Sequence, residues 1–358
     1  MKRAISIALV LVMVFALAAC GGGKSSQSAS SAPAASSSSA AAPAPAKADP
    51  VVLRFSYSLP SGSPCDQAAQ AMAAAVAEKT GGRITIETYP NCGLSGGDLV
   101  KAFEMLVSGD IDIHGSSPFT AGNFDGRYFV MWLPWLFNDR EALESALDGG
   151  LSDLLNTWAQ EKGMTILTTC YAGARELSNS VREVKTVDDI KGLVIRVPGA
   201  SMFIDTFNAL GAAPVAMDFS EVYTASQQGT IDGQENPLST YYSAALQEVQ
   251  KYITMYNMVY DTTIFYMNSA KFNSLSAEDQ QILLECAKEA GIQYRDNVIA
   301  TDEALASSLV DEYGCTVTYL TDEELKTFQD AVTPIYEQYK SVIGEDVVTE
   351  VLKLAGKG

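Results

Sequence analysis

The sequence predicts an α/β protein made of two related lobes, each built around a mostly parallel sheet. Segments rich in β-branched residues alternate with segments in which apolar residues recur at helical spacing. A segment with the order strand, proline, helix, Gly-x-Ile-Asp also occurs twice. The Gly-x-Ile-Asp motif that ends each copy is Gly109–Asp112 in the first and Gly229–Asp232 in the second, 120 residues later. Residues 51–358 are numerous enough for two lobes with cores of their own.

The first copy of this order begins directly after a low-complexity segment. Strands are expected where apolar and β-branched residues run or alternate, and helices where apolar residues recur every three or four positions. Pro90 stops the second strand, and Gly81 follows the first helix, where a glycine commonly ends one. The predicted elements are a strand over 51–57, a helix over 66–79, a strand over 83–89, a helix over 98–108 and a strand that starts at 109–113.

The second copy repeats the pattern and is followed by long helices. Pro198 stops the first strand of this copy, LVIRV, and Gly211 ends its first helix. Sequences typical of a capping box start helices at Thr186, Ser276 and Thr321. The predicted elements are strands over 193–197, 214–217 and 316–320, and helices over 201–210, 220–228, 276–309 and 323–354, the last with an interruption near Gly344.

The first twenty residues predict an export signal. Lys2 and Arg3 precede an apolar run over 4–18, and the run closes in LAAC at Cys20. This ending resembles the bacterial lipobox, which implies cleavage before Cys20 and lipidation of its sulfur; a plain signal peptide with an incidental cysteine is the alternative. We expect residues 1–19 to be the signal peptide and residues 20–50, rich in Gly, Ser, Ala and Pro, to be a flexible linker.

Charge and cysteine content exclude several kinds of partner. The net charge is −19, and −21 once Lys2 and Arg3 are removed, so the protein would repel nucleic acid and anionic membrane surfaces. The cysteines form no CxxC pair and His114 is the only histidine, so we expect no metal site. Cys65 and Cys92 each follow a predicted strand, and they could form a disulfide or remain free thiols.

Two polar stretches are expected at the carboxyl ends of strands, which is where open parallel sheets bind ligands. One is QGTIDGQENPLST over 228–240, which Pro237 interrupts, and the other is His114–Ser117. Two lobes whose strand ends face each other form a cleft. We therefore interpret these residues as the lining of a cleft rather than as solvated turns.

Arg196 is the sharpest signal in the sequence. It is the only charged residue in LVIRV, a strand expected to be covered on both faces. A buried guanidinium needs a negative partner. That partner is either an internal acid, with Asp232 and Glu235 as candidates, or the carboxylate of a ligand, which the planar guanidinium fork can bind through two hydrogen bonds.

Other residues near these strand ends have a structural and a functional interpretation. Arg175 could be a surface residue paired with Glu176 or a second cation in the cleft. Asn236 could occupy a turn or orient a bound anion through its amide. Phe219 and Tyr223 could be core aromatics or an apolar wall for the ligand.

Several segments make the sequence similar to a known family. TGGRITIETYP, GLVIRVPGA, LGAAPVAMDFSEVYTASQQGTIDGQENP and EVQKYIT resemble the solute-binding proteins of tripartite ATP-independent periplasmic (TRAP) transporters, of the dicarboxylate-binding DctP type. The resemblance covers residues 51–358. It implies a two-lobed periplasmic-binding-protein-like fold, type II-like, with strands that cross between the lobes and a long helix that spans both.

The resemblance also assigns roles to residues. It implies that Arg196 pairs with the ligand carboxylate and that Arg175, Asn236 and Phe219 contact the ligand. At two first-lobe positions where some relatives carry other polar residues, this chain has Asp98 and Ser117. The predicted ligand-binding residues are therefore Arg196, Arg175, Asn236, Phe219, Ser117, Tyr223 and Asp98.

The implied function is capture of a small organic acid and its delivery to a small and a large membrane subunit. The resemblance implies no cofactor, and we expect a monomer that is held to the membrane by its lipid and faces the periplasm or the cell exterior. We expect the first lobe to comprise residues 51–172 and 262–300. The second lobe, with the spanning helix, would comprise residues 173–261 and 301–358. The ligand could be a dicarboxylate, a keto acid, a sugar acid or an aromatic acid.

Two alternatives compete with this interpretation. Gly93–Gly97 matches the G-x-S-x-G pattern of hydrolases, with Ser95 as nucleophile and His114 as the sole candidate base. The pattern is short, and Pro90 and Asn91 separate it from the preceding strand, whereas a nucleophile elbow follows its strand directly. The other alternative is a binding protein that delivers its ligand to a membrane sensor, for which the binding chemistry would be the same.

Overall fold

The computed structural model describes residues 49–357, and the predicted signal peptide, Cys20 and most of the linker lie outside them. The described residues belong to one compact unit. No helix among them combines the length and the apolar character that a membrane span requires.

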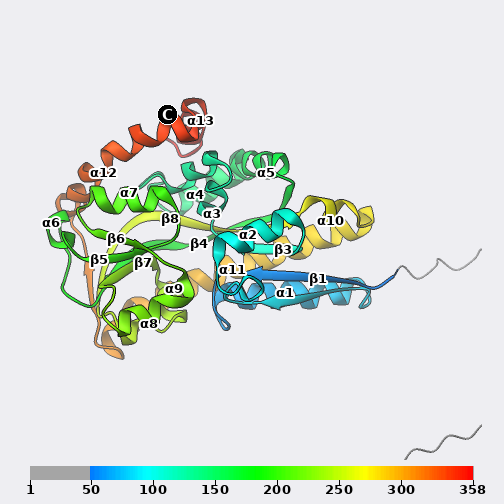
Figure 1. Ribbon diagram of the computed structural model, residues 1–358, viewed down its shortest axis with the longest axis horizontal. Coiled ribbons are helices and arrows are strands. Elements are labelled where there is room, and N and C mark those ends of the chain that lie inside the picture. The colour runs from blue at the N-terminus through cyan, green and yellow to red at the C-terminus, as the bar shows by residue number, and fades with distance from the viewer. Residues whose placement is uncertain (1–48, 358) are drawn as a thin grey trace, which may run out of the picture. The chain divides into compact units, whose positions relative to one another are not determined.

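A single nine-stranded mixed sheet runs through the described residues (Figure 1). Its order is β2-β1-β3-β8-β4-β7-β5-β6, and β9 pairs with β8. The strands near each end are parallel, as predicted. The antiparallel pairs are β3–β8, β8–β4 and β4–β7, whereas β9 pairs with β8 in parallel. The strands are β1 (Val51–Tyr57), β2 (Ile84–Tyr89), β3 (Ile113–Ser116), β4 (Met164–Asn179), β5 (Val194–Val197), β6 (Ala213–Ala216), β7 (Gly233–Pro237), β8 (Tyr252–Asn268) and β9 (Thr316–Tyr319).

The two halves of the sheet have the same strand order when each is read from its outer edge inward. The first half reads β2, β1, β3, β8, and the second half reads β6, β5, β7, β4. The repeated Gly-x-Ile-Asp motif occupies equivalent places in the two halves. Asp112 precedes β3 and accepts a hydrogen bond from the backbone N–H of Arg54 in β1, at 2.8 Å. Asp232 precedes β7 and accepts one from Val194 in β5, also at 2.8 Å. The internal repeat predicted from the sequence is therefore a structural repeat.

Helices cover the two faces of the sheet. Predicted caps are present: Ser276 accepts the N–H of Asp279, and Thr186 and Thr321 form capping boxes. Gly344 separates the last two helices, as predicted. The helices are α1 (Pro64–Lys79), α2 (Leu99–Ser108), α3 (Phe119–Gly122), α4 (Arg140–Ala146), α5 (Ser152–Glu161), α6 (Val187–Ile190), α7 (Ser201–Ala209), α8 (Val222–Gln227), α9 (Leu238–Ser243), α10 (Ser269–Asn273), α11 (Ala277–Asp311), α12 (Asp322–Ile343) and α13 (Glu345–Leu354).

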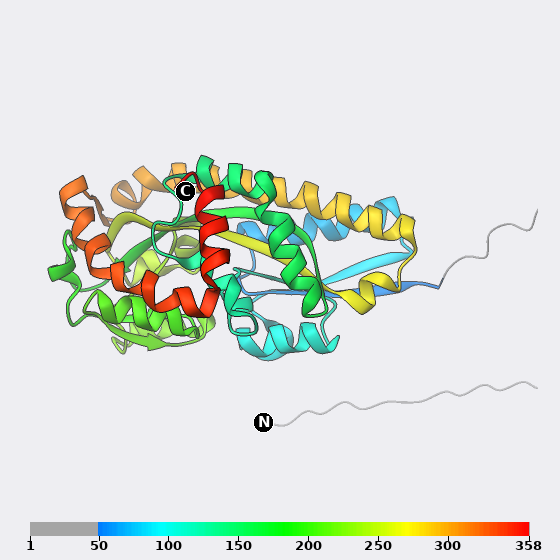
Figure 2. The same ribbon diagram turned by 90° about the horizontal axis from the view of Figure 1, so that it is seen from above.

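Three long elements connect the two halves of the sheet: β4, β8 and α11. Figure 2 shows α11 running beside both halves, and β4 and β8 pair with each other along nearly their whole length. The pairing of β4 with β8 changes register between Tyr171 and Gly173. Gly173 has φ of +108°, and a Cβ there would lie 2.5 Å from the Cβ of Pro237, so this position requires glycine. The predicted lobe boundaries at 172/173, 261/262 and 300/301 fall within these three elements.

The structure differs from the sequence-based expectations at two places, and at a third it decides between two alternatives that the sequence left open. The stretch over 228–240 is not a loop at the end of a strand, because Gly233–Pro237 is itself the buried strand β7 and α9 follows it directly. Cys65 and Cys92 are free thiols: Cys65 packs in the main core, and Cys92 packs in a separate cluster with Ala102 and Ile111. Helix α13, which we expected in the second lobe, packs against α4 and the neighbouring short helices of the first.

Candidate functional site

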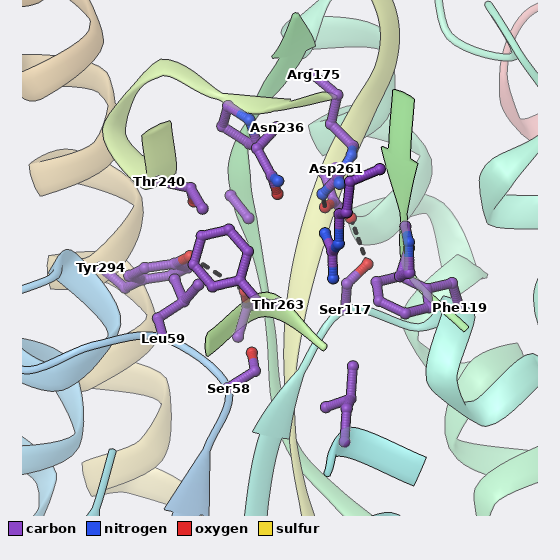
Figure 3. Close-up of a pocket in the computed structure, with 16 residues that line it drawn as sticks. Ser58, Leu59, Ser117, Phe119, Arg175, Asn236, Thr240, Asp261, Thr263 and Tyr294 are labelled. Carbon is purple, nitrogen blue, oxygen red and sulfur yellow. Dashed lines mark hydrogen bonds and ion pairs between the residues drawn. The ribbon is translucent and has the colours of Figure 1, made fainter. Parts of the chain in front are cut away.

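A cavity lies between the two halves of the sheet, beside the crossing strands (Figure 3). The space open to the centres of water-sized molecules is about 60 Å³. Its walls carry two arginines, one acid, an amide, several hydroxyls and an apolar surface. The lining residues are Ser58, Leu59, Leu99, Ser117, Phe119, Ala172, Arg175, Arg196, Pro198, Phe219, Asn236, Pro237, Thr240, Asp261, Thr263 and Tyr294.

Arg196 extends from β5 into this cavity and is only 3% exposed. Its Nε and Nη2 donate to the backbone carbonyl of Met217 at 2.9 and 2.7 Å, and its guanidinium carbon lies 5.5 Å from the centre of the Phe219 ring. Among the described residues, no carboxylate forms an ion pair with it. Burial and the charge of Arg175 lower the pKa of Arg196 to about 10, although Glu235 opposes the shift. The guanidinium is therefore buried without a counter-ion.

Both internal acids that were candidates for pairing with Arg196 have other partners. Asp232 binds the backbone of β5. Glu235 binds Arg175: Nε donates to Oε2 at 2.6 Å, and Nη2 donates to Oε1 at 2.7 Å. Of the two interpretations of Arg196, pairing with an internal acid is therefore wrong.

Arg175 forms ion pairs with two buried acids of the protein. Besides its two bonds to the Glu235 carboxylate, its Nη2 donates to the Glu235 backbone carbonyl at 2.9 Å and its Nη1 donates to Oδ2 of Asp261 at 2.8 Å. Its guanidinium lies 4.6 Å from the centre of the Trp132 ring. Burial alone would lower the pKa of Arg175, but the two carboxylates outweigh it and raise the pKa. Arg175 is thus buried in the site, and the alternative of a surface arginine paired with Glu176 is wrong. The side chain of Glu176 instead accepts the N–H groups of Tyr256 and Asn257.

Asn236 reaches the cavity from β7 and is the end of a buried chain of polar side chains. Its Nδ2 donates to Oε1 of Gln234, whose Nε2 donates to Ser178 at 2.7 Å. Ser178 donates to Gln250 at 2.7 Å, and Gln250 donates to Ser226 at 2.8 Å. One end of the Asn236 amide is thus bound to protein, and the other end is left for the cavity.

Five of the seven predicted ligand-binding residues line the cavity, and two do not. Ser117 and Phe219 line it, and the hydroxyl of Ser117 donates to Oδ1 of Asp261 at 2.6 Å. Tyr223 lies in α8, where its hydroxyl donates to the exposed Glu248 at 2.7 Å. Asp98 caps α2 by accepting the N–H of Lys101 at 2.8 Å. The structure therefore does not place Tyr223 or Asp98 in the lining, and Leu99, next to Asp98, occupies that wall.

The sequence interpretation missed Asp261, Tyr294 and the hydroxyls of Ser58 and Thr263, whereas Thr240 lies in the stretch that was expected to line a cleft. A signal for Asp261 was present, because it is the only charge in the buried strand segment MVYDTTIFYM over 258–267, as Arg196 is in LVIRV. Tyr294 had no such signal, since it lies within a long helix in which apolar positions usually indicate core packing.

The geometry expected of a hydrolase is not present at Gly93–Gly97. These residues form a short 3₁₀ turn, and Ser95 donates to the backbone carbonyls of Cys92 and Asp98 at 2.9 and 2.6 Å. His114 is fully buried in β3, and burial lowers its pKa to about 4. Within the described residues, no group of three or more His, Cys, Asp or Glu side chains could hold a metal ion.

Comparisons with known proteins agree with this architecture. The family model "Bacterial extracellular solute-binding protein, family 7" (DctP) matches residues 55–342. The 2,3-diketo-L-gulonate-binding periplasmic protein YiaO of Escherichia coli is 35% identical over 283 residues, which are 78% of this chain and 84% of that protein. The C4-dicarboxylate-binding periplasmic protein DctP of Rhodobacter capsulatus is 29% identical over 85% of this chain and 91% of that protein.

Solved structures show the same fold with bound acids. A TRAP periplasmic solute-binding protein of Ralstonia eutropha, crystallised with (S)-2-acetolactate, aligns with a TM-score of 0.82 at 32% identity, over 86% of this chain and 99% of that one. The sugar-acid-binding protein of Advenella mimigardefordensis, in complex with galactonate, aligns with a TM-score of 0.82 at 30% identity, over the same shares. The chain therefore belongs to family 7 of the bacterial extracellular solute-binding proteins, the DctP family of TRAP solute-binding proteins.

Proposed function

We propose that this chain captures a small organic acid in the cavity by pairing its carboxylate with Arg196, and delivers the acid to TRAP membrane subunits. The relatives support this proposal, because 2,3-diketo-L-gulonate, acetolactate and galactonate, named for three of them, all carry a carboxylate. The observation that carries it is Arg196, a buried cation that faces the cavity without an anion of its own.

The guanidinium of Arg196 is oriented for such a ligand. Its Nε and one Nη2 hydrogen are directed at the carbonyl of Met217, which leaves the two Nη1 hydrogens and one on Nη2. The remaining Nη2 hydrogen and one of the Nη1 hydrogens lie along one edge of the planar group, where a carboxylate can accept two parallel hydrogen bonds. Because the guanidinium is buried, the attraction between the two charges would be stronger there than at an exposed site.

The other lining residues would position the ligand. Arg175 has one Nη1 hydrogen beyond those bound by Glu235 and Asp261, so we assign it a hydrogen bond rather than a free positive charge. Asn236 would orient the ligand through the end of its amide that faces the cavity. Phe219, in contact with the Arg196 guanidinium, would form an apolar wall.

Binding would be coupled to closure of the lobes over the cavity. Contacts across its rim support this: Nδ2 of Asn123 donates to the backbone carbonyl of Gly199 at 3.0 Å. Gly97 and Ser220, which lie close in sequence to the lining residues Leu99 and Phe219, also meet across the two lobes, because a Cβ added at Gly97 would lie 2.9 Å from Oγ of Ser220. Opening at this rim would admit the ligand, and closing would exclude water from it.

The proposed setting is the outer face of a membrane, with the chain acting as a receptor and not as an enzyme. The signal peptide, lipidation at Cys20, the linker and the monomeric state remain predictions from the sequence. Mass spectrometry of the protein purified from membranes would test lipidation, because a diacylated Cys20 at the N-terminus adds the mass of its lipid.

A thermal-shift screen of organic acids, followed by calorimetry, tests the binding function. Each acid that raises the melting temperature is compared with its methyl ester, which has nearly the same shape but no negative charge. We expect the acid to bind and the ester to bind at least about tenfold more weakly, as the loss of one charge-assisted hydrogen bond would produce. Equal binding of acid and ester would contradict carboxylate capture by Arg196.

A further inference from the structure

Asp261 places a negative charge in the wall of the cavity, close to the proposed carboxylate site. We propose that Asp261 makes the site selective for short acids that carry a single carboxylate together with hydroxyl groups, and that it rejects dicarboxylates. This inference rests on the proposed function and specifies its ligand class.

The charged residues of the lining and their ion-pair partners already balance in number without a ligand. Arg175 and Arg196 are offset in number by Glu235 and Asp261, and among the lining residues there is no lysine or histidine. A first ligand carboxylate would bind Arg196, the cation that lacks an ion pair. A second carboxylate would find no free cation and would add to an excess of negative charge among buried groups, which is strongly unfavourable.

The carboxylate of Asp261 is held in place and still has an acceptor position free. Its Oδ1 accepts the hydroxyl of Ser117 at 2.6 Å and the N–H of Thr262 at 2.8 Å. Its Oδ2 accepts only Nη1 of Arg175, at 2.8 Å. Since a carboxylate oxygen has two acceptor positions, Oδ2 could accept a hydroxyl group of the ligand, whereas a second ligand carboxylate would be repelled.

The remaining polar groups of the wall also suit hydroxyl groups (Figure 3). Within the described part of the chain, the side-chain hydroxyls of Ser58 and Thr240 form no hydrogen bond with protein. Tyr294 accepts the hydroxyl of Thr263 at 3.1 Å and keeps its own proton to donate. Hydroxyl groups both donate and accept, so they match ligand hydroxyls, which do the same.

The size of the cavity limits the length of the ligand. The space open to the centres of water-sized spheres is only about 60 Å³, so the closed cavity suits a small acid rather than a bulky one.

Calorimetry with four acids of equal chain length separates the two parts of this inference. The probes are 2,3,4-trihydroxybutanoate, tartrate, succinate and butanoate, which combine one or two carboxylates with the presence or absence of hydroxyls. The proteins are the wild type, Asp261→Asn, and the control Asp296→Asn. Asp296 lies on the same helix as Tyr294 but is exposed and paired with Arg295.

In the wild type and the control, we expect trihydroxybutanoate to bind at least about tenfold more tightly than the other three acids. In Asp261→Asn, which removes the negative charge but keeps the shape, the preference over tartrate should shrink at least about fivefold. If tartrate or succinate binds the wild type as tightly as trihydroxybutanoate, the selectivity is overturned while carboxylate capture stands. If the preference survives in Asp261→Asn, the role of Asp261 is overturned. If none of the four acids binds at millimolar concentration, the proposed ligand class is overturned. The proposed function is tested separately, by comparing the binding of acids with that of their methyl esters.

Discussion

Replacing Arg196 with alanine should weaken ligand binding strongly while leaving the fold intact. In the structure this guanidinium binds one backbone carbonyl and no carboxylate, so the protein itself loses little when it is removed. The ligand would lose two charge-assisted hydrogen bonds, each worth about 1.5–3 kcal/mol. Breaking a buried charged pair typically costs about 2–5 kcal/mol, which corresponds to a loss of affinity of about 30-fold to several thousand-fold.

Two measurements check this prediction. Calorimetry with any acid that binds the wild type gives the change in Kd, and a denaturant titration gives the free energy of unfolding without ligand. The matched control is Arg182→Ala, because Arg182 also donates to backbone carbonyls, those of Asp189 and Lys191, but lies exposed outside the cavity. Unchanged affinity in Arg196→Ala, or a loss of folding stability larger than the loss of binding energy, would refute the reasoning.

Further predictions concern the neighbouring arginine, the pH dependence of stability and the rim of the cavity. Arg175→Met should lower the free energy of unfolding by about 3–5 kcal/mol in denaturant titrations, because it leaves two buried carboxylates unpaired; a change below about 1 kcal/mol would contradict the ion-pair assignment. Burial raises the pKa of Asp302 to about 7, so the folded protein favours the protonated acid, and the contribution of Asp302 to stability is lost as pH rises from about 4 to about 7. Asp302→Asn should therefore raise the free energy of unfolding by about 1–3 kcal/mol at pH 8 and change it little at pH 4, and an equal effect at both pH values would exclude this titration. Gly97→Ala should weaken ligand binding by about tenfold, because the added methyl group meets Ser220 when the rim is closed. Adding Ser220→Ala should restore part of the affinity, and an unchanged deficit in the double variant would point to strain at the positive φ of Gly97 instead.

The main elements of the fold could be predicted because local pattern and tertiary structure agree in this chain. The strand over 51–57 and the long helix starting after Ser276 were predicted to within about two residues. The repeated Gly-x-Ile-Asp motif indicated two equivalent halves, because an aspartate directly before a strand can bind the backbone of the neighbouring strand in each half. What the pattern could not show is that the two halves share one continuous sheet, since pairing between strands that lie 73 to 104 residues apart leaves no local signal.

The site was predictable where a charge stands alone in an apolar strand. This reasoning identified Arg196, and the same reasoning applied to the strand around Asp261 would have identified the second charge of the wall. Local sequence could not decide where a side chain points. Tyr223 and Asp98 lie close in sequence to the lining residues Phe219 and Leu99, yet one faces Glu248 and the other caps its own helix.

The buried stretch Gly233–Pro237 shows why polarity alone was misleading. Gln, Glu and Asn in succession are typical of a turn, and here they form a strand in the middle of the sheet. Burial is tolerated because Gln234 and Asn236 bind each other and Glu235 binds Arg175. Arg175, and Ser178 which binds Gln234, come from the neighbouring strand β4, so the sequence of the stretch itself cannot reveal them.

The pairing of β4 with β8 limits how the protein can move. Both β4 and β8 extend into both halves of the sheet. The halves therefore cannot separate by breaking the hydrogen bonds between one pair of neighbouring strands. Relative motion must instead bend this two-stranded ribbon. The pairing changes register at three places, and the one next to Gly173 provides a place where the ribbon can bend without breaking the ladder on either side. Opening would then be an elastic deformation with a low barrier, and ligand exchange would not require any part of the protein to unfold.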